Sequence, residues 1–200
     1  MIIFENCTQE PFNIFKDLYN MAFNEEKAIE AMSLSTIDLD QKKPFSRYVN
    51  IKYAKNNKLV FFTNYNSNKA NQLDKVNNVS CIFYWKSINT QIRIEGSISK
   101  SDKSLSDYHF SKRSLEKNAL AISSNQSKSI ECYEKVVDKY DKVLPKVTRD
   151  TKRPDYWGGF EISPNYFEFW TGYKNRLNKR KEFRLIDDKS NIWRTAYLEP

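Results

Sequence analysis

Five residues between positions 47 and 69 have side chains of the kinds that hold phosphate groups in proteins: Arg47, Lys52, Thr63, Ser67 and Lys69. Arginine and lysine donate charge-assisted hydrogen bonds to phosphate oxygens. A helix expected over residues 68–75 would add the free N–H groups of its first turn. If the chain brings these groups together, they form a phosphate-binding site. The alternative is an ordinary hairpin whose charged ends are solvated.

Two short strands joined by a tight turn would position these groups. Residues 48–51 and 59–62 are rich in the β-branched and aromatic side chains that favour strands. Residues 55–58 (KNNK) between them favour a turn. Pairing of the strands would bring the cations of the first strand close to the hydroxyl groups that follow the second. The sequence therefore predicts a β-hairpin that leads into a helix.

Composition limits the other classes of function. The 200 residues fit one domain with a substantial core, and 13 Phe, 12 Tyr and 4 Trp suit packed strands. With only 4 Gly, the nucleotide-binding loops GxGxxG and GxxxxGK(S/T) are absent. The single histidine, His109, excludes a multi-histidine metal site and argues against a Ser-His-Asp triad. We therefore expect no metal, and we expect any enzyme chemistry to depend on a bound cofactor.

We expect no targeting segment in this sequence. It contains no run of about 18 apolar residues, the length that spans a membrane. The first residues (MIIFE) lack the basic and apolar segments of a signal peptide. Cys7, Cys81 and Cys132 are scattered, odd in number and without CxxC spacing, which predicts reduced thiols. We expect a cytoplasmic protein that does not associate with membranes.

The formal net charge of +8 raises the alternative of nucleic-acid binding. The densest basic run, residues 174–181, closely follows an aromatic stretch at 166–170. Basic residues beside aromatic ones can pair with phosphates and stack on bases. The charges are nevertheless spread along the chain, and no nucleic-acid-binding motif accompanies them. We therefore expect a solvated basic surface and no nucleic-acid partner.

The rest of the chain predicts a mainly β fold of α+β type. Expected helices lie at residues 11–22, 68–75 and within a helical stretch at 104–144. Expected strands lie at residues 32–38, 48–51, 59–62, 79–85, 90–99, 158–162, 166–170, 182–186 and 192–198. Residues 79–85 (VSCIFYW) are too uniformly apolar for a half-exposed strand, so we expect that strand to sit inside the sheet. The pattern predicts one domain over residues 1–200, an antiparallel barrel with flanking helices.

Seven motifs in order resemble those of the pyridoxamine 5′-phosphate oxidases, an FMN-dependent family. They are RYVNIK, FFTNYNSNK, QIRIEG, AISSNQS, WGGFEISP, FEFWTGYKNRLNKR and WRTAYLEP. The resemblance covers nearly the whole chain, and the motifs contain all 4 glycines. It implies an FMN-binding split β-barrel and a homodimer, with a C-terminal dimerisation segment at about residues 157–200.

The resemblance also implies which residues contact FMN, at a site assembled from both subunits. They are Arg47, Tyr48, Val49, Asn50, Ile51, Lys52, Phe62, Thr63, Ser67, Asn68, Lys69, Gln91, Gln126, Ser127, Trp170 and Arg180. Arg47 and Lys69 would neutralise the phosphate, and Gln91 would hydrogen-bond the flavin ring. Asn68 stands where the family usually has a second arginine, so weaker FMN binding is expected.

The expected substrate pocket departs further from the family. Lys52, His109, Arg113 and Lys117 take the places that bind the substrate's anionic group, with His109 and Lys117 replacing a tyrosine and a serine. The family's Arg-x-His over the reacting side of the substrate becomes Arg176-Leu177-Asn178. Arg176 and Asn178 are therefore the expected catalytic and substrate-binding residues. An amide can donate and accept hydrogen bonds, but it cannot titrate as imidazole does.

The implied reaction is the oxidation of an amine or alcohol carbon beside an aromatic ring. A hydride would pass to FMN, and dioxygen would reoxidise the flavin with release of hydrogen peroxide. The expected product is pyridoxal 5′-phosphate or a related anionic ring. Two alternatives remain open: a relative of the phenazine type that oxidises another anionic ring in a secondary pathway, and a flavin-binding protein without oxidase turnover.

Overall fold

The computed structural model describes residues 1–187 and 190–200. Its strands are β1 (Ile3–Glu5), β2 (Ala31–Asp38), β3 (Lys43–Lys55), β4 (Lys58–Asn64), β5 (Asn78–Trp85), β6 (Thr90–Lys100), β7 (Trp157–Thr171), β8 (Lys179–Asp187) and β9 (Ile192–Leu198). Its α-helices are α1 (Glu10–Glu25), α2 (Asn68–Lys75), α3 (Lys103–Lys112), α4 (Leu115–Ser123) and α5 (Tyr133–Val143).

Six of these strands close into a barrel. The antiparallel neighbours run β3-β2-β5-β6-β7-β4, and β4 pairs again with β3. Strands β8 and β9 extend the sheet beyond β7, and the short β1 joins β3 in parallel. The predicted antiparallel barrel with flanking helices is confirmed. The parallel β1 was not predicted.

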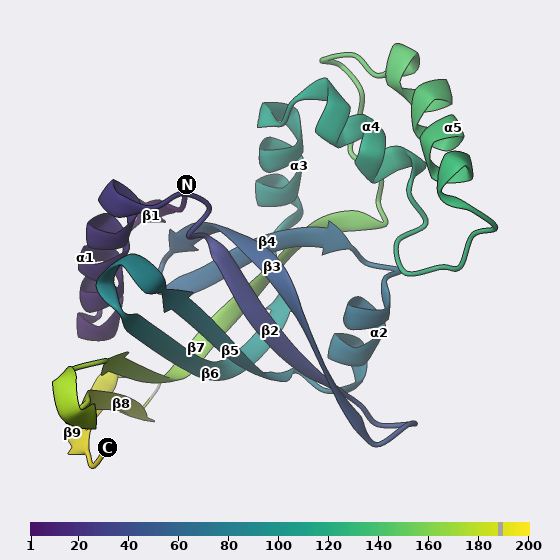
Figure 1. Ribbon diagram of the computed structural model, residues 1–200. Coiled ribbons are helices and arrows are strands. Elements are labelled where there is room, and N and C mark those ends of the chain that lie inside the picture. Colours follow the sequence, from purple (N-terminus) through teal and green to yellow (C-terminus); the bar gives the residue numbers. More distant parts are fainter. Residues whose placement is uncertain (188–189) are drawn as a thin grey trace.

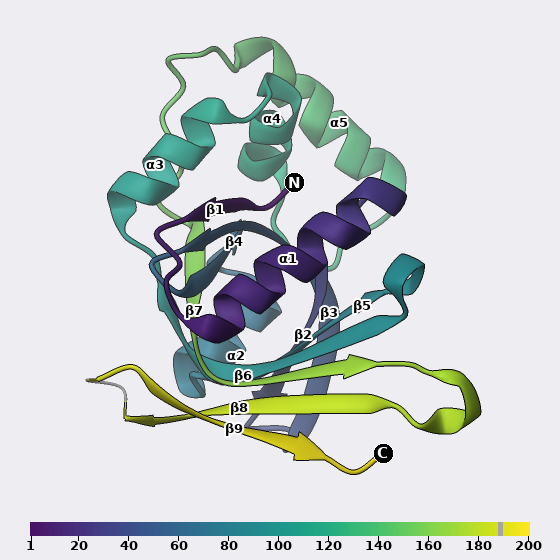
Figure 2. The ribbon, with the colours of Figure 1, turned by 90° about the vertical axis from the view of Figure 1, so that its left-hand side faces the viewer.

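The helices lie at different places around the barrel. Helices α3, α4 and α5 form a group at one end of it, and α2 lies beside the far ends of β2 and β3 (Figure 1). Strands β8 and β9 lie on the opposite side of the barrel from α2, as the two views together show (Figure 2). Helix α1 packs its apolar stripe, which includes Phe12, Phe15 and Tyr19, into the core, as predicted.

The central hairpin forms as predicted. Asn56 and Asn57, between β3 and β4, both have positive φ, at 51° and 58°. Two consecutive left-handed residues make a type I′ turn, whose twist matches that of paired strands, and asparagine tolerates this conformation. Helix α2 begins at Asn68, directly after Ser67, as expected.

Two strand predictions were wrong. Residues 158–162 and 166–170 belong to one strand, β7, and not to two. Pro164 lies opposite Gly96 and Tyr166 lies opposite Glu95, so the strand absorbs one extra residue as a bulge and continues. A Cβ atom on Gly96 would lie 2.2 Å from the carbonyl oxygen of Ser163, so glycine allows the close approach of the two backbones there.

Strand β5 lies inside the sheet but is not buried on both faces. Its side chains alternate between buried and more exposed, and Ile82 and Tyr84 are 38% and 57% exposed. The apolar run therefore covers one core face and one outer face. The predicted free thiols are confirmed: Cys7, Cys81 and Cys132 are unpaired.

Candidate active site

A cleft of about 1440 Å³ lies between the hairpin, α2 and the α3–α4 region. Many of the predicted site residues line it: Arg47, Tyr48, Val49, Asn50, Lys52, Phe62, Thr63, Asn68, Lys69, His109, Arg113, Lys117, Gln126 and Ser127. They come from segments that are widely separated in sequence. The predicted residues Ile51 and Ser67 are next or close in sequence to lining residues, but they are fully buried and do not line the cleft.

Lys69 lies at the bottom of this cleft among hydroxyl groups. Its Nζ donates to Thr63 Oγ1 at 2.8 Å and to Ser67 Oγ at 3.2 Å, and the residue is 8% exposed. Burial, reinforced by the charge of Arg47, lowers the pKa of Lys69 to about 8. An anion in the cleft would favour the charged ammonium group. We call Arg47, Thr63, Ser67 and Lys69 the phosphate site.

Arg47 is held on the wall of the cleft by neutral groups. Its Nη1 donates to Thr36 Oγ1 at 2.6 Å and to the Leu34 carbonyl oxygen at 3.3 Å. Its Nη2 donates to Gln72 Oε1 at 3.0 Å, and Thr36 Oγ1 donates to the same oxygen at 2.6 Å. Burial lowers the pKa of the guanidinium. Since no carboxylate of the described residues takes part, these contacts position the charge of Arg47 without neutralising it.

The sequence did not reveal Thr36 and Gln72 as members of this arrangement. They lie on β2 and α2, and their residue types are common in strands and helices. Only the fold brings them onto Arg47. Gln126, which was predicted, accepts from Thr63 Oγ1 at 2.9 Å and from the Asn64 N–H at 3.3 Å. It thereby fixes the loop after α4 against the end of β4.

Three parallel rings form one wall of the cleft. Phe62 and His109 stack with centroids 3.8 Å apart and 7° between their planes. The Trp157 ring is nearly parallel to both. Its centroid lies 5.5 Å from that of Phe62, with 12° between the planes, and 6.3 Å from that of His109, with 8° between the planes. We call Phe62, His109 and Trp157 the aromatic wall. Trp157 was not predicted as a site residue, although it opens the WGGFEISP motif.

The cations beside the aromatic wall are Lys52, Arg113 and Lys117. The Arg113 guanidinium lies 4.4 Å from the Trp157 ring centroid, and its Nη2 donates to the Lys117 carbonyl oxygen at 2.8 Å. Its Nη1 is buried and has no hydrogen-bond partner in the described part of the chain. Burial lowers the pKa of Arg113 to about 10. Arg113 therefore brings a positive charge, and a guanidinium N–H without a partner, to the lining of the cleft, which suits an anionic ligand.

Besides Ile51 and Ser67, five other predicted residues do not line the cleft. Gln91, Trp170 and Arg180 are register neighbours across β6, β7 and β8, and Arg176 and Asn178 lie in the connection from β7 to β8. Strand β8, which pairs with Trp170 and begins directly after Asn178, lies on the side of the barrel away from α2 (Figure 1). One copy of the chain therefore does not bring the predicted site together. We call these five residues the β7–β8 group.

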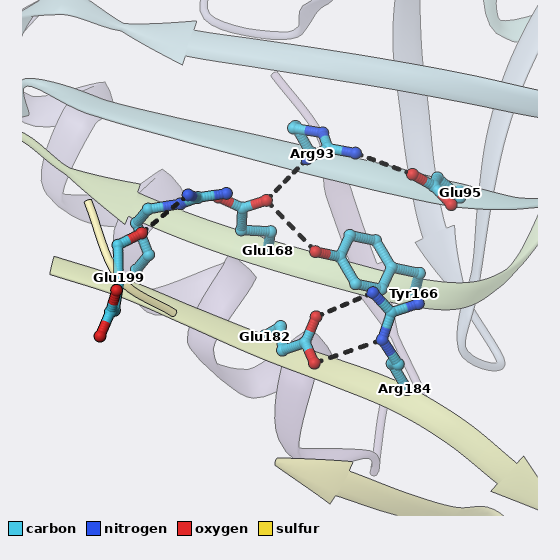
Figure 3. A network of polar contacts seen from close by, with 8 residues as sticks. Arg93, Glu95, Tyr166, Glu168, Glu182, Arg184 and Glu199 are labelled. Carbon is cyan, nitrogen blue, oxygen red and sulfur yellow. Dashed lines mark hydrogen bonds and ion pairs between the residues drawn. The ribbon is translucent and has the colours of Figure 1, made fainter. Parts of the chain in front are cut away.

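An ion-pair network supports the β7–β8 group (Figure 3). Glu168 is 2% exposed, and its two oxygens accept from Arg180 Nε and Arg93 Nη1, each at 2.7 Å. The Tyr166 hydroxyl donates to the same carboxylate at 3.2 Å. Burial alone would raise the pKa of Glu168, but the two arginines outweigh it and the pKa is lowered. Glu168 was not predicted as part of the site.

The connection from β7 to β8 has a strained backbone. Asn175 and Arg176 have φ of 59° and 60°, the left-handed region that a long side chain such as arginine rarely adopts. Asn178 Oδ1 accepts from the Tyr173 N–H at 3.2 Å. Strained backbone of this kind is concentrated at functional sites, and here it holds the predicted catalytic arginine.

Two family models match the chain. Residues 22–144 match the model described as pyridoxamine 5′-phosphate oxidase. Residues 157–200 match the model described as the pyridoxine 5′-phosphate oxidase C-terminal dimerisation region. No helix in the described residues is long and apolar enough to cross a membrane. The same residues contain no group of three or more side chains that could hold a metal ion.

Curated relatives agree with the models. The chain is 36% identical over 199 residues to pyridoxine/pyridoxamine 5′-phosphate oxidase of Rippkaea orientalis, covering 98% of this chain and 92% of the relative. It is 31% identical over 192 residues to pyridoxine/pyridoxamine 5′-phosphate oxidase 1 of Hydrogenovibrio crunogenus, covering 96% and 88%.

Solved structures share the fold. PhzG from Burkholderia lata, in complex with tetrahydrophenazine-1-carboxylic acid, superposes with a TM-score of 0.88 at 25% identity, covering 98% of this chain and 95% of that one. A pyridoxamine 5′-phosphate oxidase-related, FMN binding protein from Nostoc punctiforme has a TM-score of 0.80 at 13% identity, covering 96% and 98%.

Proposed function

Because this chain belongs to the pyridoxamine 5′-phosphate oxidase family, we propose that it is an FMN-dependent oxidase acting on pyridoxamine or pyridoxine 5′-phosphate. The observation that carries this proposal is the phosphate site. Arg47 and Lys69 lie partly or wholly buried in one cleft, and their hydrogen-bond partners in the described residues are neutral. Burying two positive charges without a counter-ion costs free energy, and a bound anion would offset this cost.

The residues present fit FMN. Lys69 and Thr63 would hold its phosphate together with Arg47, and the buried Ser67 hydroxyl would keep the Lys69 ammonium in place. The cleft of about 1440 Å³ is large enough for both a flavin and a small substrate. When bound, FMN supplies the hydride acceptor, and dioxygen is the proposed oxidant that regenerates it with release of hydrogen peroxide. Asn68 lines the cleft without a positive charge, so the phosphate site has two cations and not three.

The chain's own residues bind and orient the substrate. The aromatic wall gives a flat apolar surface for a ring, which excludes water from one side of the site. Arg113 and Lys117 would hold the substrate's anionic group, with Lys52 nearby. Lys52 is partly neutralised, because its Nζ lies 3.6 Å from Glu30 Oε1. Arg113 is therefore the main cation for the substrate.

We further propose that the site is completed in a homodimer. The β7–β8 group of one copy would face the cleft of the other, placing FMN at the interface. Tyr48, Ile82 and Tyr84 are exposed on the outer sheet face, and Tyr48 lines both the main cleft and a hollow of about 230 Å³ beside Ile82 and Tyr84. This apolar face therefore reaches the rim of the cleft, as an interface around FMN requires. Residues 157–200, within one domain over 1–200, would form the dimerisation segment.

A second candidate is the oxidation of a carboxylated polycyclic ring. The Burkholderia lata PhzG structure, with 25% identity to this chain, contains tetrahydrophenazine-1-carboxylic acid. His109, Lys117 and Asn178 depart from the pattern expected for a pyridoxine phosphate oxidase, whereas a cationic pocket suits a carboxylate as well as a phosphate. A flavin-binding role without turnover is the remaining alternative.

One experiment separates these functions. The protein is purified, saturated with FMN, and assayed for hydrogen peroxide with pyridoxamine 5′-phosphate, pyridoxine 5′-phosphate and a dihydrophenazine carboxylate. Peroxide formed from either of the first two supports the leading proposal. Peroxide from the third alone transfers the assignment to the second candidate. Stoichiometric FMN without peroxide from any of them would leave a flavin-binding role and overturn the oxidase.

A further inference from the structure

Tyr53 and His109 form a side-chain pair at the edge of the substrate pocket. The Tyr53 hydroxyl lies 3.0 Å from His109 Nδ1, and the two rings meet edge to face with centroids 5.5 Å apart. Tyr53 is on β3 and is 4% exposed, whereas His109 is on α3 and lines the cleft. Its two ring neighbours in the described part of the chain, His109 and Phe62, both line the cleft.

The hydrogen bond has a preferred direction. A phenolic hydroxyl that is removed from water needs an acceptor, and leaving it without one is costly. In the described part of the chain, His109 Nδ1 is the only hydrogen-bond partner of the Tyr53 hydroxyl. Burial raises the pKa of Tyr53, so its proton is retained. The hydroxyl therefore donates, and Nδ1 accepts with its lone pair.

A neutral imidazole that accepts at Nδ1 carries its proton at Nε2. Nε2 has no hydrogen-bond partner in the described residues, and it is not among their buried, unpartnered atoms, so it is open to the cleft. Stacking on Phe62 at 3.8 Å fixes the plane of the ring. Burial, followed by the charges of Arg113, Lys52 and Lys117, lowers the pKa of His109 to about 4. The ring is therefore neutral at physiological pH.

We propose that Tyr53 is a positioning residue that holds His109 as the Nε2–H tautomer, so that His109 donates a hydrogen bond to the anionic group of the substrate. This inference rests on the proposed function for the identity of the substrate. Arg113 and Lys117 supply the positive charge, and His109 supplies a neutral, directed donor. A neutral donor adds geometric selection for an anion at a fixed position without increasing the repulsion among the neighbouring cations.

Because His109 is the single histidine of the chain, its ring nitrogens can be observed without overlap. The FMN-loaded protein is labelled with 15N-histidine, and both ring nitrogens are followed by NMR in the wild type and in Tyr53→Phe. The expected result in the wild type is a protonated Nε2 and an unprotonated Nδ1. In Tyr53→Phe, the 15N chemical shift of Nδ1 should move toward that of an unprotonated ring nitrogen that accepts no hydrogen bond. A protonated Nδ1 in the wild type, or an Nδ1 resonance that Tyr53→Phe does not move, would overturn the proposal.

A matched control comes from the same helix. Tyr108 is adjacent to His109 in sequence and 54% exposed, and Tyr108→Phe removes a hydroxyl group with no hydrogen bond to the imidazole. We expect it to leave the resonances of both ring nitrogens in place. An equal response to Tyr108→Phe and Tyr53→Phe would count against a specific hydrogen bond.

The donor role is tested with two probes: inorganic phosphate, and 4-deoxypyridoxine 5′-phosphate, which has no oxidisable group at its 4′ carbon. Titration with either probe should shift the Nε2–H resonance until the site is saturated. Tyr53→Phe should lower the affinity for the analogue by about three- to tenfold, the scale of one hydrogen bond. A shift with phosphate but not with the analogue would support His109 as a hydrogen-bond donor and would contradict pyridoxine phosphates as the substrate class. Binding of the analogue without any shift would reject the donor and retain the proposed function.

Discussion

Glu168 Oε1 accepts a hydrogen bond from Arg180 Nε at 2.7 Å, across the β7–β8 pair. Arg180 is an expected FMN contact, and its guanidinium would otherwise be free to rotate at the end of a strand. Its Nη1 also donates to the Glu199 carbonyl oxygen at 2.9 Å, so both ends of the group are held. Glu168 thereby fixes a cation that we assign to the cofactor of the opposite subunit.

The first prediction is that Glu168→Gln destabilises the fold. The amide cannot neutralise Arg180 and Arg93, so we expect a loss of about 2 kcal/mol, the scale of hydrogen bonds to charged groups. The pKa of Glu168 is below its ordinary value, so this stability is fully present above a pH of about 4.3 and is lost as pH falls through the lower pKa of the folded state. Urea unfolding at pH 7 and at a series of pH values below about 4 measures both effects.

Glu161→Gln on the same strand is the matched control. Glu161 pairs with Lys58, and both side chains are partly exposed, at 21% and 38%. Surface ion pairs contribute about 0–1 kcal/mol, so a smaller loss is expected there. Equal losses in the two variants would show that burial of Glu168 does not matter.

The second prediction concerns Lys69 and pH. Its pKa of about 8 in the fold is below the ordinary 10.5, so above pH 8 the free protein holds this side chain neutral. A phosphate favours the charged form, so FMN binding then takes up a proton. FMN affinity should fall by up to about tenfold per pH unit above pH 8, while riboflavin affinity stays flat. Flavin fluorescence titrations between pH 7 and 10 measure both.

Lys69→Ala provides the control for this pH dependence. It should weaken FMN by about 1.5–3 kcal/mol at pH 7 and abolish the slope above pH 8. If the slope survived the substitution, the titrating group would be another residue. If FMN and riboflavin bound equally well to the wild type, the phosphate site itself would be wrong.

The third prediction concerns the dimer. Tyr84→Asp places a charge on the exposed apolar face of β5, so sedimentation should shift toward single 23.7 kDa chains. Aromatic interface residues commonly contribute about 2 kcal/mol or more, so FMN affinity should fall with the dimer. Tyr133→Asp, at a site on α5 that is 75% exposed, should change neither quantity. A flavin-saturated monomer would contradict the shared site.

The hairpin, and the clustering of Arg47, Thr63 and Lys69 in one cleft, could be predicted because their determinants are local. The turn at Asn56 and Asn57, the strand propensities and the start of α2 all lie within about 25 residues, and this segment folds as the sequence indicates. The contact between Tyr53 and His109 joins residues 56 positions apart, and no sequence spacing reveals it.

The two wrong strand predictions have separate causes. Pro164 resembles a turn residue, but a bulge opposite Gly96 carries the strand through it. Ile82 and Tyr84 have the side chains of core residues but are exposed on the outer face, where we propose the dimer interface, and an interface and a core use the same side chains. Hydrophobicity alone cannot assign an apolar residue to one or the other. The sequence alone also does not place the β7–β8 group relative to the cleft, because in the proposed dimer that position depends on a second copy of the chain.

The last prediction concerns Asn178, which has a structural contact as well as an expected catalytic one. Its Oδ1 accepts from the Tyr173 N–H and so supports the strained turn that holds Arg176. Asn178→Ala should therefore lower kcat/KM for pyridoxamine 5′-phosphate by about tenfold, since a misplaced positioning group costs roughly that much or more. Asn178→His can keep the acceptor through a ring nitrogen and adds a group that titrates near pH 6.5.

The wild type should oxidise pyridoxamine 5′-phosphate weakly, with little change in kcat/KM between pH 6 and 8, because an amide does not titrate. Asn178→His should raise kcat/KM and introduce a pH dependence centred near the imidazole pKa of about 6.5. Steady-state peroxide assays of the wild type, Asn178→Ala and Asn178→His between pH 6 and 8 measure these differences in kcat/KM. Equal, pH-independent rates in the wild type and Asn178→His would show that residue 178 supports the turn and takes no part in proton transfer.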